Sequence, residues 1–272
     1  MTRHPWEALR SVLVIAHPGH ELRIHHWLER ARPLILVLTD GSGHTDNSRL
    51  AATTSLLEKV GATPGRLYGR FSDRQLYEAI LAADMDLFSG LIEEIAETLA
   101  RAGADYAVGD AVEGFNPTHD LCRLLLNAAL KRHAELSGRH LRNFEFLVEG
   151  APQNCPAEDR TDAIFLDLDD AAYRRKVAAV QSYTGMSADV TRLLDNFGPE
   201  AFRAECLRPV RYGLDIGDRF AHPPYYEGYG AQQVAAGFYR EVIRFRRHIA
   251  PLADQLMEEP LRSDYRAHRR AR

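Results

Sequence analysis

Two histidines follow the first hydrophobic run of the sequence, at a spacing that allows them to share a ligand. Ser11 to Ala16 is a continuous apolar and β-branched segment, and His17, Pro18, Gly19 and His20 come directly after it. Because Pro18 and Gly19 favour a turn, we expect both imidazoles to lie in one shaped loop at the end of a strand. Neutral imidazole is a preferred ligand of zinc and of its neighbours in the transition series. Histidines that only cap a helix or face solvent are commoner, so the strand-end position is what favours a metal site.

A second group of polar residues occupies positions 110–120, after a predicted strand at 106–109 and before an apolar helix. Thr118 and Asp120 fit an ordinary helix start, since Thr caps helices and Asp favours the positive end of the helix dipole. That interpretation does not explain why Glu113, Asn116 and His119 occur in the same short segment. The segment is therefore a second candidate for the functional site.

Together the two segments resemble the LmbE/PIG-L family of metal-dependent N-deacetylases. The family begins with a strand ending in Ala-His-Pro-Asp-Asp-Glu, and residues 16–21 of this sequence read Ala-His-Pro-Gly-His-Glu. The family later carries a segment of the type Glu-Gly-Gly-His-Pro-Asp-His-Asp, and residues 113–120 read Glu-Gly-Phe-Asn-Pro-Thr-His-Asp. Residues 39–41, Thr-Asp-Gly, match a turn of the family at the end of the second predicted strand. The resemblance covers roughly residues 10–135.

The resemblance implies one zinc ion held by His17, His20 and His119. His20 stands where the family has an aspartate, so the expected centre has three imidazoles and one open position for water. Such a ligand set is known for catalytic zinc, and it is one charge more positive than the family's.

The resemblance does not indicate which residue of this sequence would act as the general base. The family's base position is Gly19 here, and glycine cannot accept a proton. Asp40, Glu113 and Asp120 are the neighbouring carboxylates by sequence, and we expect one of them to replace it. Glu113 and Asp120 are equally suited to orienting a ligand histidine.

Five further residues are candidates for contacting a substrate. They are His44, Arg49, Asn116, Tyr226 and Glu227. His44 lies in a glycine-rich loop, Arg49 is suited to an anionic group, and Asn116 takes the place of a family histidine. Tyr226 and Glu227 belong to an aromatic-rich segment that suits a sugar-like ligand, because amphipathic rings cover sugar faces. Exposed loop positions, a salt bridge at a helix start and ordinary loop packing are the simpler alternatives.

The elements that position these residues alternate between strand and helix up to residue 150. Such alternation predicts an α/β fold with a mostly parallel, Rossmann-like sheet flanked by helices. Strands are predicted at 11–16, 34–39, 66–68, 106–109 and 162–168, with a short apolar segment at 144–148, and helices at 21–30, 48–60, 74–82, 84–101, 120–136, 169–195 and 231–258. We expect one domain over 1–272, in which 1–150 forms the sheet with the metal motifs and 151–272 is a mainly helical extension that completes it. Ligands of such sheets bind outside the carboxyl ends of the strands.

Composition excludes several classes of protein. The 272 residues are 45% hydrophobic and 26% charged, which allows a substantial core and excludes collagen-like and low-complexity chains. A net charge of −4 argues against a general nucleic-acid binder. No apolar run is long enough for a membrane span, and three separated cysteines do not suggest a disulfide framework. We therefore expect a cytoplasmic protein with a small-molecule substrate and with no nucleic-acid or membrane partner, and the sequence leaves a homo-oligomer open.

The interpretation that these features favour is a zinc-dependent hydrolase. The resemblance implies an N-deacetylase or amidase that acts on an amino-sugar-like or other small polar N-acyl substrate. Two alternatives remain open because the family's base is absent. One is a metal-retaining binding or regulatory protein without hydrolysis, and the other is a metalloenzyme with non-hydrolytic chemistry on the same scaffold.

Overall fold

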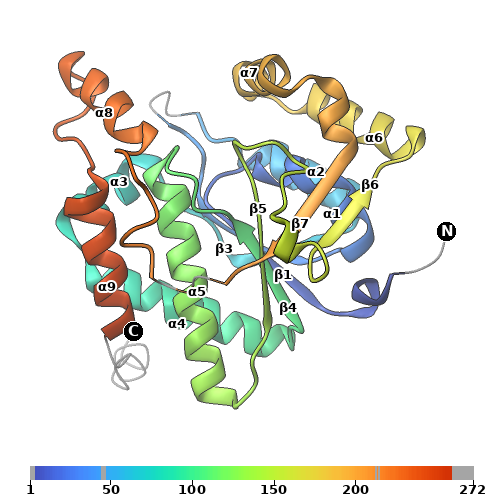
Figure 1. Ribbon diagram of the computed structural model, residues 1–272, viewed down its shortest axis with the longest axis horizontal. Coiled ribbons are helices and arrows are strands. Elements are labelled where there is room, and N and C mark those ends of the chain that lie inside the picture. Colours follow the sequence, from blue (N-terminus) through green and yellow to red (C-terminus); the bar gives the residue numbers. More distant parts are fainter. Residues whose placement is uncertain (1–3, 44–46, 212, 214, 259–272) are drawn as a thin grey trace.

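In the part of the chain that the structure describes, seven strands form one mixed sheet with helices on both of its faces (Figure 1). The computed structural model describes residues 4–43, 47–211, 213 and 215–258. The strands are β1 (Ser11–Ile15), β2 (Leu34–Thr39), β3 (Thr63–Phe71), β4 (Tyr106–Asp110), β5 (Arg142–Phe146), β6 (Ile164–Asp167) and β7 (Ala204–Pro209). Their order is β3-β2-β1-β4-β5-β7-β6; the first five are parallel, and β7 is antiparallel to both of its neighbours. The predicted α/β fold with a mostly parallel sheet is confirmed.

The central strands are buried because helices cover both faces of the sheet. In β1, Val12 and Val14 belong to one hydrophobic core, whereas Leu13 and Ile15 belong to the core on the opposite face. All four side chains are fully buried. A strand with two buried faces needs apolar residues at consecutive positions, and this is why the continuous runs in β1 and β2 identified them correctly.

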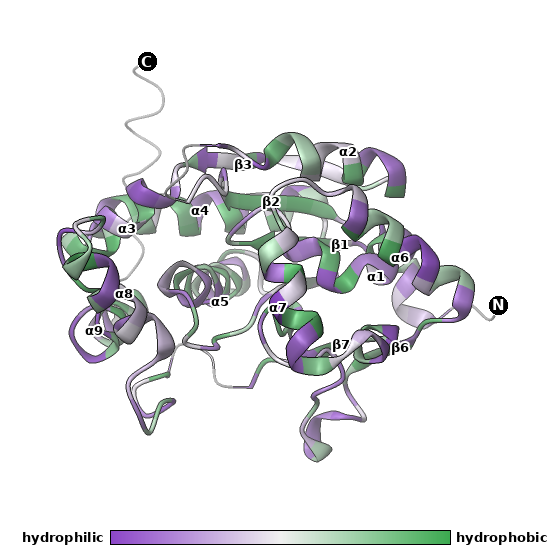
Figure 2. Cartoon of the chain, turned by 90° about the horizontal axis from the view of Figure 1, so that it is seen from above, coloured by the Kyte–Doolittle hydropathy of each residue, from purple (hydrophilic) through white to green (hydrophobic). Residues whose placement is uncertain are grey.

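The helices divide between the two faces of the sheet (Figure 2). In chain order they are α1 (His25–Ala31), α2 (Leu50–Val60), α3 (Asp73–Ala82), α4 (Met85–Ala102), α5 (Pro117–Ser137), α6 (Asp170–Ser182), α7 (Ser187–Phe197), α8 (Tyr225–Ala235) and α9 (Ala250–Glu258). Residues of α3, α4, α5 and α9 build one core, and residues of α1, α2 and α6 build the other. None of the helices in the described part of the chain combines the length and hydropathy that spanning a membrane requires.

Two long helices expected from the sequence are each interrupted. The predicted helix at 169–195 is two helices, α6 and α7, separated by a turn in which Gly185 has φ +85°. The predicted helix at 231–258 is likewise broken: α8 ends at Ala235, Gly237 follows with φ +80°, and a π-helical turn at Phe245–Ile249 leads into α9. The glycine at positive φ closes the end of α8, whereas α6 ends at Tyr183, whose backbone is extended (φ −84°, ψ 114°).

Strand β7 is not predicted by the sequence, and β5 is found where only a short apolar segment was expected. The β7 residue Glu205 is 1% exposed, and a buried carboxylate is untypical of an interior strand. Its charge is compensated by Lys176 of α6, whose Nζ lies 2.9 Å from Glu205 Oε1. Glu205 also accepts hydrogen bonds from the backbone N–H groups of His26 and Trp27. This compensation comes from other elements of the fold, so the local sequence could not reveal it.

Candidate functional site

The first motif lies in a tight loop at the carboxyl end of β1. Gly19 has φ +108° and begins a short 3₁₀ helix, His20–Ile24. The Gly19 N–H donates to Glu21 Oε2 at 2.8 Å, and Thr53 Oγ1 donates to Glu21 Oε1 at 2.7 Å. Glu21 therefore braces the loop, and the loop turns His17 and His20 toward the same place.

The structure brings together the three predicted histidines, His17, His20 and His119. Their ring centroids lie 5.3 Å (His17–His20), 5.0 Å (His17–His119) and 4.4 Å (His20–His119) apart. Each residue is 4–5% exposed. His119 comes from the first turn of α5, where Asn116 caps the helix and Pro117 is the first helical residue. The cluster lies between β1 and β4, where the strand order reverses and where open α/β sheets bind their ligands.

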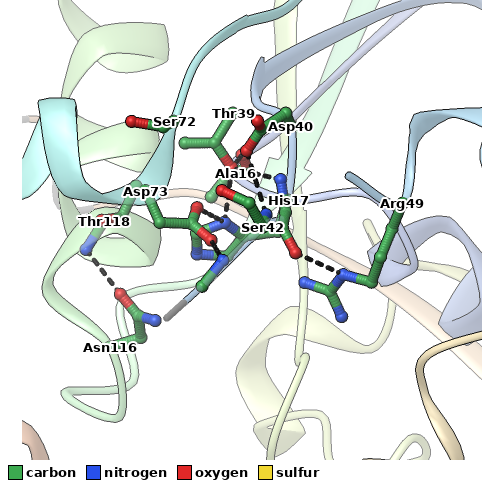
Figure 3. Close-up of polar contacts among 12 residues, drawn as sticks. Ala16, His17, Thr39, Asp40, Ser42, Arg49, Ser72, Asp73, Asn116 and Thr118 are labelled. Carbon is green, nitrogen blue, oxygen red and sulfur yellow. Dashed lines mark hydrogen bonds and ion pairs between the residues drawn. The ribbon is translucent and has the colours of Figure 1, made fainter. Parts of the chain in front are cut away.

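Two carboxylates that the sequence did not identify orient these imidazoles. His20 Nδ1 donates to Asp110 Oδ2 at 3.0 Å, and the same oxygen accepts from the Ala16 N–H at 2.8 Å. His17 Nδ1 lies 2.8 Å from Asp73 Oδ1 and 2.7 Å from Thr39 Oγ1, as Figure 3 shows. A carboxylate on Nδ1 fixes the ring and leaves Nε2 available for a ligand.

Only one of these two carboxylates had a local sequence signal. Asp110 ends β4 and opens the segment 110–120 that was singled out. Asp73 is the first residue of α3, and nothing in the nearby sequence connects it with a histidine 56 positions earlier.

The surroundings of His20 and His119 shift the pKa values of these two imidazoles in opposite directions. Burial by itself lowers the pKa of His20, but the Asp110 carboxylate outweighs burial and the pKa is raised above its ordinary value. Burial, together with the charges of His20, His17 and Arg49, holds the pKa of His119 well below its ordinary value. Burial raises the pKa of Asp73, yet the neighbouring His17 and hydrogen bonds from Thr39 and the backbone lower it below its usual range. His119 is thus a neutral imidazole beside two carboxylate-held ones.

The donor chemistry of the cluster fits a metal, although its donor atoms are not already arranged around one. Within the described ranges, no group of three or more His, Cys, Asp or Glu side chains has the geometry to hold a metal ion. However, His17 Nε2 and His119 Nδ1 are buried and find no hydrogen-bond partner among the described residues. Buried polar atoms normally have a hydrogen-bond partner. A metal ion that binds imidazole nitrogen would provide these two nitrogens with the partner that they lack.

The three candidate bases are placed differently. Asp40 Oδ1 accepts from the Ser42 N–H at 2.9 Å and shapes the loop after β2. Glu113 accepts from three consecutive backbone N–H groups, those of residues 148–150, at 2.6–3.2 Å. Asp40 and Glu113 therefore both brace loops.

Asp120 keeps one carboxylate oxygen unused. Its Oδ1 accepts from the N–H groups of Glu113 and Gly114, both at 3.2 Å, whereas its Oδ2 is buried with no partner in the part of the chain that the structure describes. Burial raises the pKa of Asp120 to about 7. Of the three candidates, Asp120 has the surroundings most suited to exchanging a proton near neutral pH.

The place where the family keeps its base is filled by a methionine. A Cβ atom on Gly19 would lie 3.0 Å from Met186 Sδ and 3.2 Å from Met186 Cε. Met186 is in the turn between α6 and α7 and also contacts the guanidinium of Arg49. Any side chain at position 19 would therefore meet backbone strain, and Met186 would have to move by a few tenths of an ångström to admit it.

Two of the predicted substrate contacts, Arg49 and Asn116, already make hydrogen bonds within the protein. Arg49 donates from Nε to Gly41 O at 2.9 Å (Figure 3). Its charge lowers the pKa of both His20 and His119. Asn116 Oδ1 accepts from the Thr118 N–H at 2.8 Å, so Asn116 serves as the cap of α5.

Two of the remaining candidates, Tyr226 and Glu227, belong to α8. Tyr226 is 4% exposed, and its hydroxyl is buried without a partner among the residues described. Glu227 accepts from the Phe245 N–H at 2.9 Å and pairs with Arg244, which ties α8 to the segment before α9. His44 lies outside the described residues.

Comparison with known proteins identifies the fold. No protein-family model matches the sequence, and no curated protein is detectably similar to it. Two solved structures superpose on it with a TM-score of 0.50. One is a triple mutant of the deacetylase of the teicoplanin biosynthetic pathway, which is 15% identical and matches over 74% of this chain and 97% of that chain. The other is the A40926 pseudoaglycone deacetylase, which is 17% identical and matches over 75% of this chain and 98% of that chain. Matches at this identity show the fold alone, and the chain therefore has the LmbE-like fold of these deacetylases.

Proposed function

We propose that this protein is a zinc-dependent hydrolase of the N-deacetylase type, acting on an amino-sugar-like or other small polar N-acyl substrate. The observation that carries the proposal is the cluster of three buried imidazoles at the carboxyl end of β1. His20 is hydrogen-bonded through Nδ1 to the Asp110 carboxylate, and His17 Nδ1 lies 2.8 Å from Asp73 Oδ1 and 2.7 Å from Thr39 Oγ1. Such pairs are typical of histidines that bind a metal through the other nitrogen. The deacetylase-like fold supports the reaction class.

In this proposal His17, His20 and His119 hold the ion. Zinc bound there would act as a Lewis acid toward the carbonyl of the N-acyl group. Asp110 and Asp73 keep two of the rings in the required tautomer and orientation. Burial of the cluster excludes bulk water, which strengthens every electrostatic interaction within it.

We assign the proton transfer to Asp120. It is adjacent to His119 in sequence, it is buried, and its Oδ2 has no partner in the described part of the chain. The raised pKa of this carboxyl lets it gain and lose a proton around neutral pH. Arg49, whose charge reaches two of the imidazoles, is suited to holding an anionic or carbonyl oxygen of the substrate.

The test combines metal quantification with turnover on a panel of N-acyl sugars. Purified protein is expected to bind one zinc ion, and His119→Ala should lose most of it. His133→Ala is the matched control, because His133 lies on the same helix and is equally buried but packs against Arg139 and Ser137. Undiminished zinc in His119→Ala, with loss in His133→Ala, would refute the assignment.

One observation favours a second function, a metal-retaining binding protein without hydrolysis. Gly19 and Met186 together leave no carboxylate at the position of the family's base. Stoichiometric zinc with no turnover on any N-acyl compound would support this alternative, or non-hydrolytic chemistry at the same centre. Zinc with turnover that falls in Asp120→Asn would support the hydrolase.

A further inference from the structure

A fully buried guanidinium lies against the carboxyl ends of β4 and β5. Arg123 of α5 is 0% exposed, although an arginine is almost never fully buried without a charged partner. Its Nε donates to Asp110 O at 2.6 Å, and its Nη2 donates to Phe144 O at 3.0 Å. Its Nη1 donates to Asn143 Oδ1 at 2.9 Å and to Asn127 Oδ1 at 3.4 Å. All four acceptors are neutral oxygens, so hydrogen bonds to the chain hold this guanidinium, and no ion pair with a carboxylate of the described residues explains its position.

The sheet has room for this guanidinium because position 109 has no side chain. A Cβ atom on Gly109 would lie 2.9 Å from Arg123 Nη2 and 2.7 Å from Val14 O, which is closer than van der Waals contact allows. Glycine is the residue that permits such a close approach to the backbone. Gly109 therefore lets Arg123 reach the carbonyl groups of two neighbouring parallel strands, β4 and β5.

One of these carbonyl groups belongs to Asp110, whose carboxylate supports the histidine cluster. The carboxylate is fully buried, and its Oδ2 accepts from the Ala16 N–H at 2.8 Å and from His20 Nδ1 at 3.0 Å. Its Oδ1 has no partner in the part of the chain that the structure describes. Because only one oxygen of the carboxylate is held, the position of that oxygen depends on how firmly the Asp110 backbone is fixed. Arg123 contacts this backbone directly, and its charge also offsets part of the cost of burying the carboxylate.

Helix α5 thus contributes to the cluster through two side chains. His119 and Arg123 are four residues apart on α5, so they lie on the same face of the helix, one turn from each other. The ring of His119 is part of the cluster, and its centroid lies 4.4 Å from that of His20. Arg123 reaches the His20 ring through Asp110. One face of α5 therefore supports two of the three imidazoles, His119 directly and His20 through a partner.

We propose that Arg123 is a positioning residue of the histidine cluster. It fixes the Asp110 backbone, so that the Asp110 carboxylate holds His20 through Nδ1 and leaves Nε2 of the ring available for the ligand. The inference rests on the proposed function only in taking that ligand to be a metal ion. Partners that orient a ligand histidine affect metal affinity without touching the metal, and Arg123 extends this support by one further residue.

The test follows the His20 ring by NMR in the metal-free full chain. The exchange with water of the Nδ1–H proton that His20 donates to Asp110 reports on this hydrogen bond, and the signal is assigned by its absence in His20→Asn. Arg123→Met keeps the apolar stem and removes the donors, and we expect exchange at least about 10-fold faster, as for the loss of one ordinary hydrogen bond. In a competition titration, zinc affinity should fall about 3–10-fold, less than the about 10–100-fold caused by losing a partner bonded directly to a ligand.

Three further variants control this comparison. Arg123→Lys keeps the cation and a donor for Asp110 O, so it should retain the His20 signal and most of the zinc affinity. Asn143→Ala removes one acceptor of Arg123 and leaves the Asp110 contact in place, so it should lower the stability in urea without changing either readout. Arg123→Gln, which keeps one amide donor, takes the place of Arg123→Met if the latter does not fold.

Two results would overturn the positioning role. The first is a folded Arg123→Met or Arg123→Gln variant in which the His20 proton exchanges as in the wild type and zinc binds as tightly. The second is an equal change of both readouts in Arg123→Met and Asn143→Ala, which would show that Arg123 only stabilises the pairing of β4 with β5.

The NMR experiment separates this inference from the proposed function, because it needs neither zinc nor turnover. A protein that binds no zinc, but whose His20 proton depends on Arg123, would refute the proposed hydrolase and leave the positioning role standing. Zinc-dependent turnover, together with a His20 proton that is insensitive to Arg123, would refute the positioning role alone.

Discussion

Restoring a carboxylate at position 19 tests how this chain differs from the deacetylases that it resembles. Gly19→Asp places the family's residue at φ +108°, a conformation that costs an L-residue about 1–2 kcal/mol. Its Cβ would also lie 3.0 Å from Met186 Sδ, and overpacking of this kind costs about 1–3 kcal/mol. We therefore expect Gly19→Asp to lower the free energy of unfolding by about 2–5 kcal/mol. For a chain of this size that is a decrease in Tm of about 4–20 °C.

The two contributions can be separated by a matched variant and a double mutant. Gly138 has φ +68°, and a Cβ added there would meet no described atom within 4 Å, so Gly138→Asp measures the backbone strain alone. Met186→Ala combined with Gly19→Asp should recover about 1–3 kcal/mol, because it removes the overpacking. Urea unfolding at pH 7 gives the four free energies needed for the cycle. Only in the double variant do we expect a gain in turnover on a simple N-acyl sugar, up to the roughly 10²–10⁴-fold that general-base catalysis contributes.

Two outcomes would refute this reasoning. A Gly19→Asp variant as stable as the wild type would show that neither the strain nor the Met186 contact limits this position. Additive effects of Gly19→Asp and Met186→Ala would show that Met186 does not fill the missing side chain's place. Zinc content must be measured in each variant, since a new carboxylate is itself a potential ligand.

Four further predictions follow from other contacts. Asp110→Asn should lower zinc affinity about 10–100-fold, because His20 loses the carboxylate that orients it; unchanged affinity in a competition titration would argue against that role. Zinc held by three imidazoles should be released below about pH 6, and retention at about pH 4 would point to carboxylate ligands. Lys176→Met should cost about 3–5 kcal/mol in urea unfolding, since it leaves Glu205 buried without its cation; a cost below about 1 kcal/mol would contradict this. Burial lowers the pKa of His25, so protonation of this imidazole favours the unfolded chain, and the wild type loses stability as the pH falls below about 6.5. His25→Gln should therefore lose less stability than the wild type between about pH 7 and pH 5, as measured by urea unfolding.

The sequence by itself determined the elements whose patterns are local. Continuous apolar runs located β1 and β2 because both of their faces are buried. The helix predicted at 48–60 ends where α2 ends, because Gly61 adopts the left-handed conformation there. The sequence also predicted that His17, His20 and His119 share one site, and the structure brings their rings together, because a strand end and a helix start in an α/β fold deliver their residues to one edge of the sheet. Their role as metal ligands stays a prediction.

Only the tertiary structure decided how these residues are supported. Asp73 reaches His17 from another helix, Met186 fills the space beside Gly19 from a turn 167 residues away, and Lys176 compensates the buried Glu205 of β7. Pairings of this kind join positions that share no local pattern, because their energy arises only after the chain has folded and buried the charges. The same reason explains why Tyr226, a predicted substrate contact, is buried: the packing of α8 against the rest of the fold decides which of its side chains face solvent.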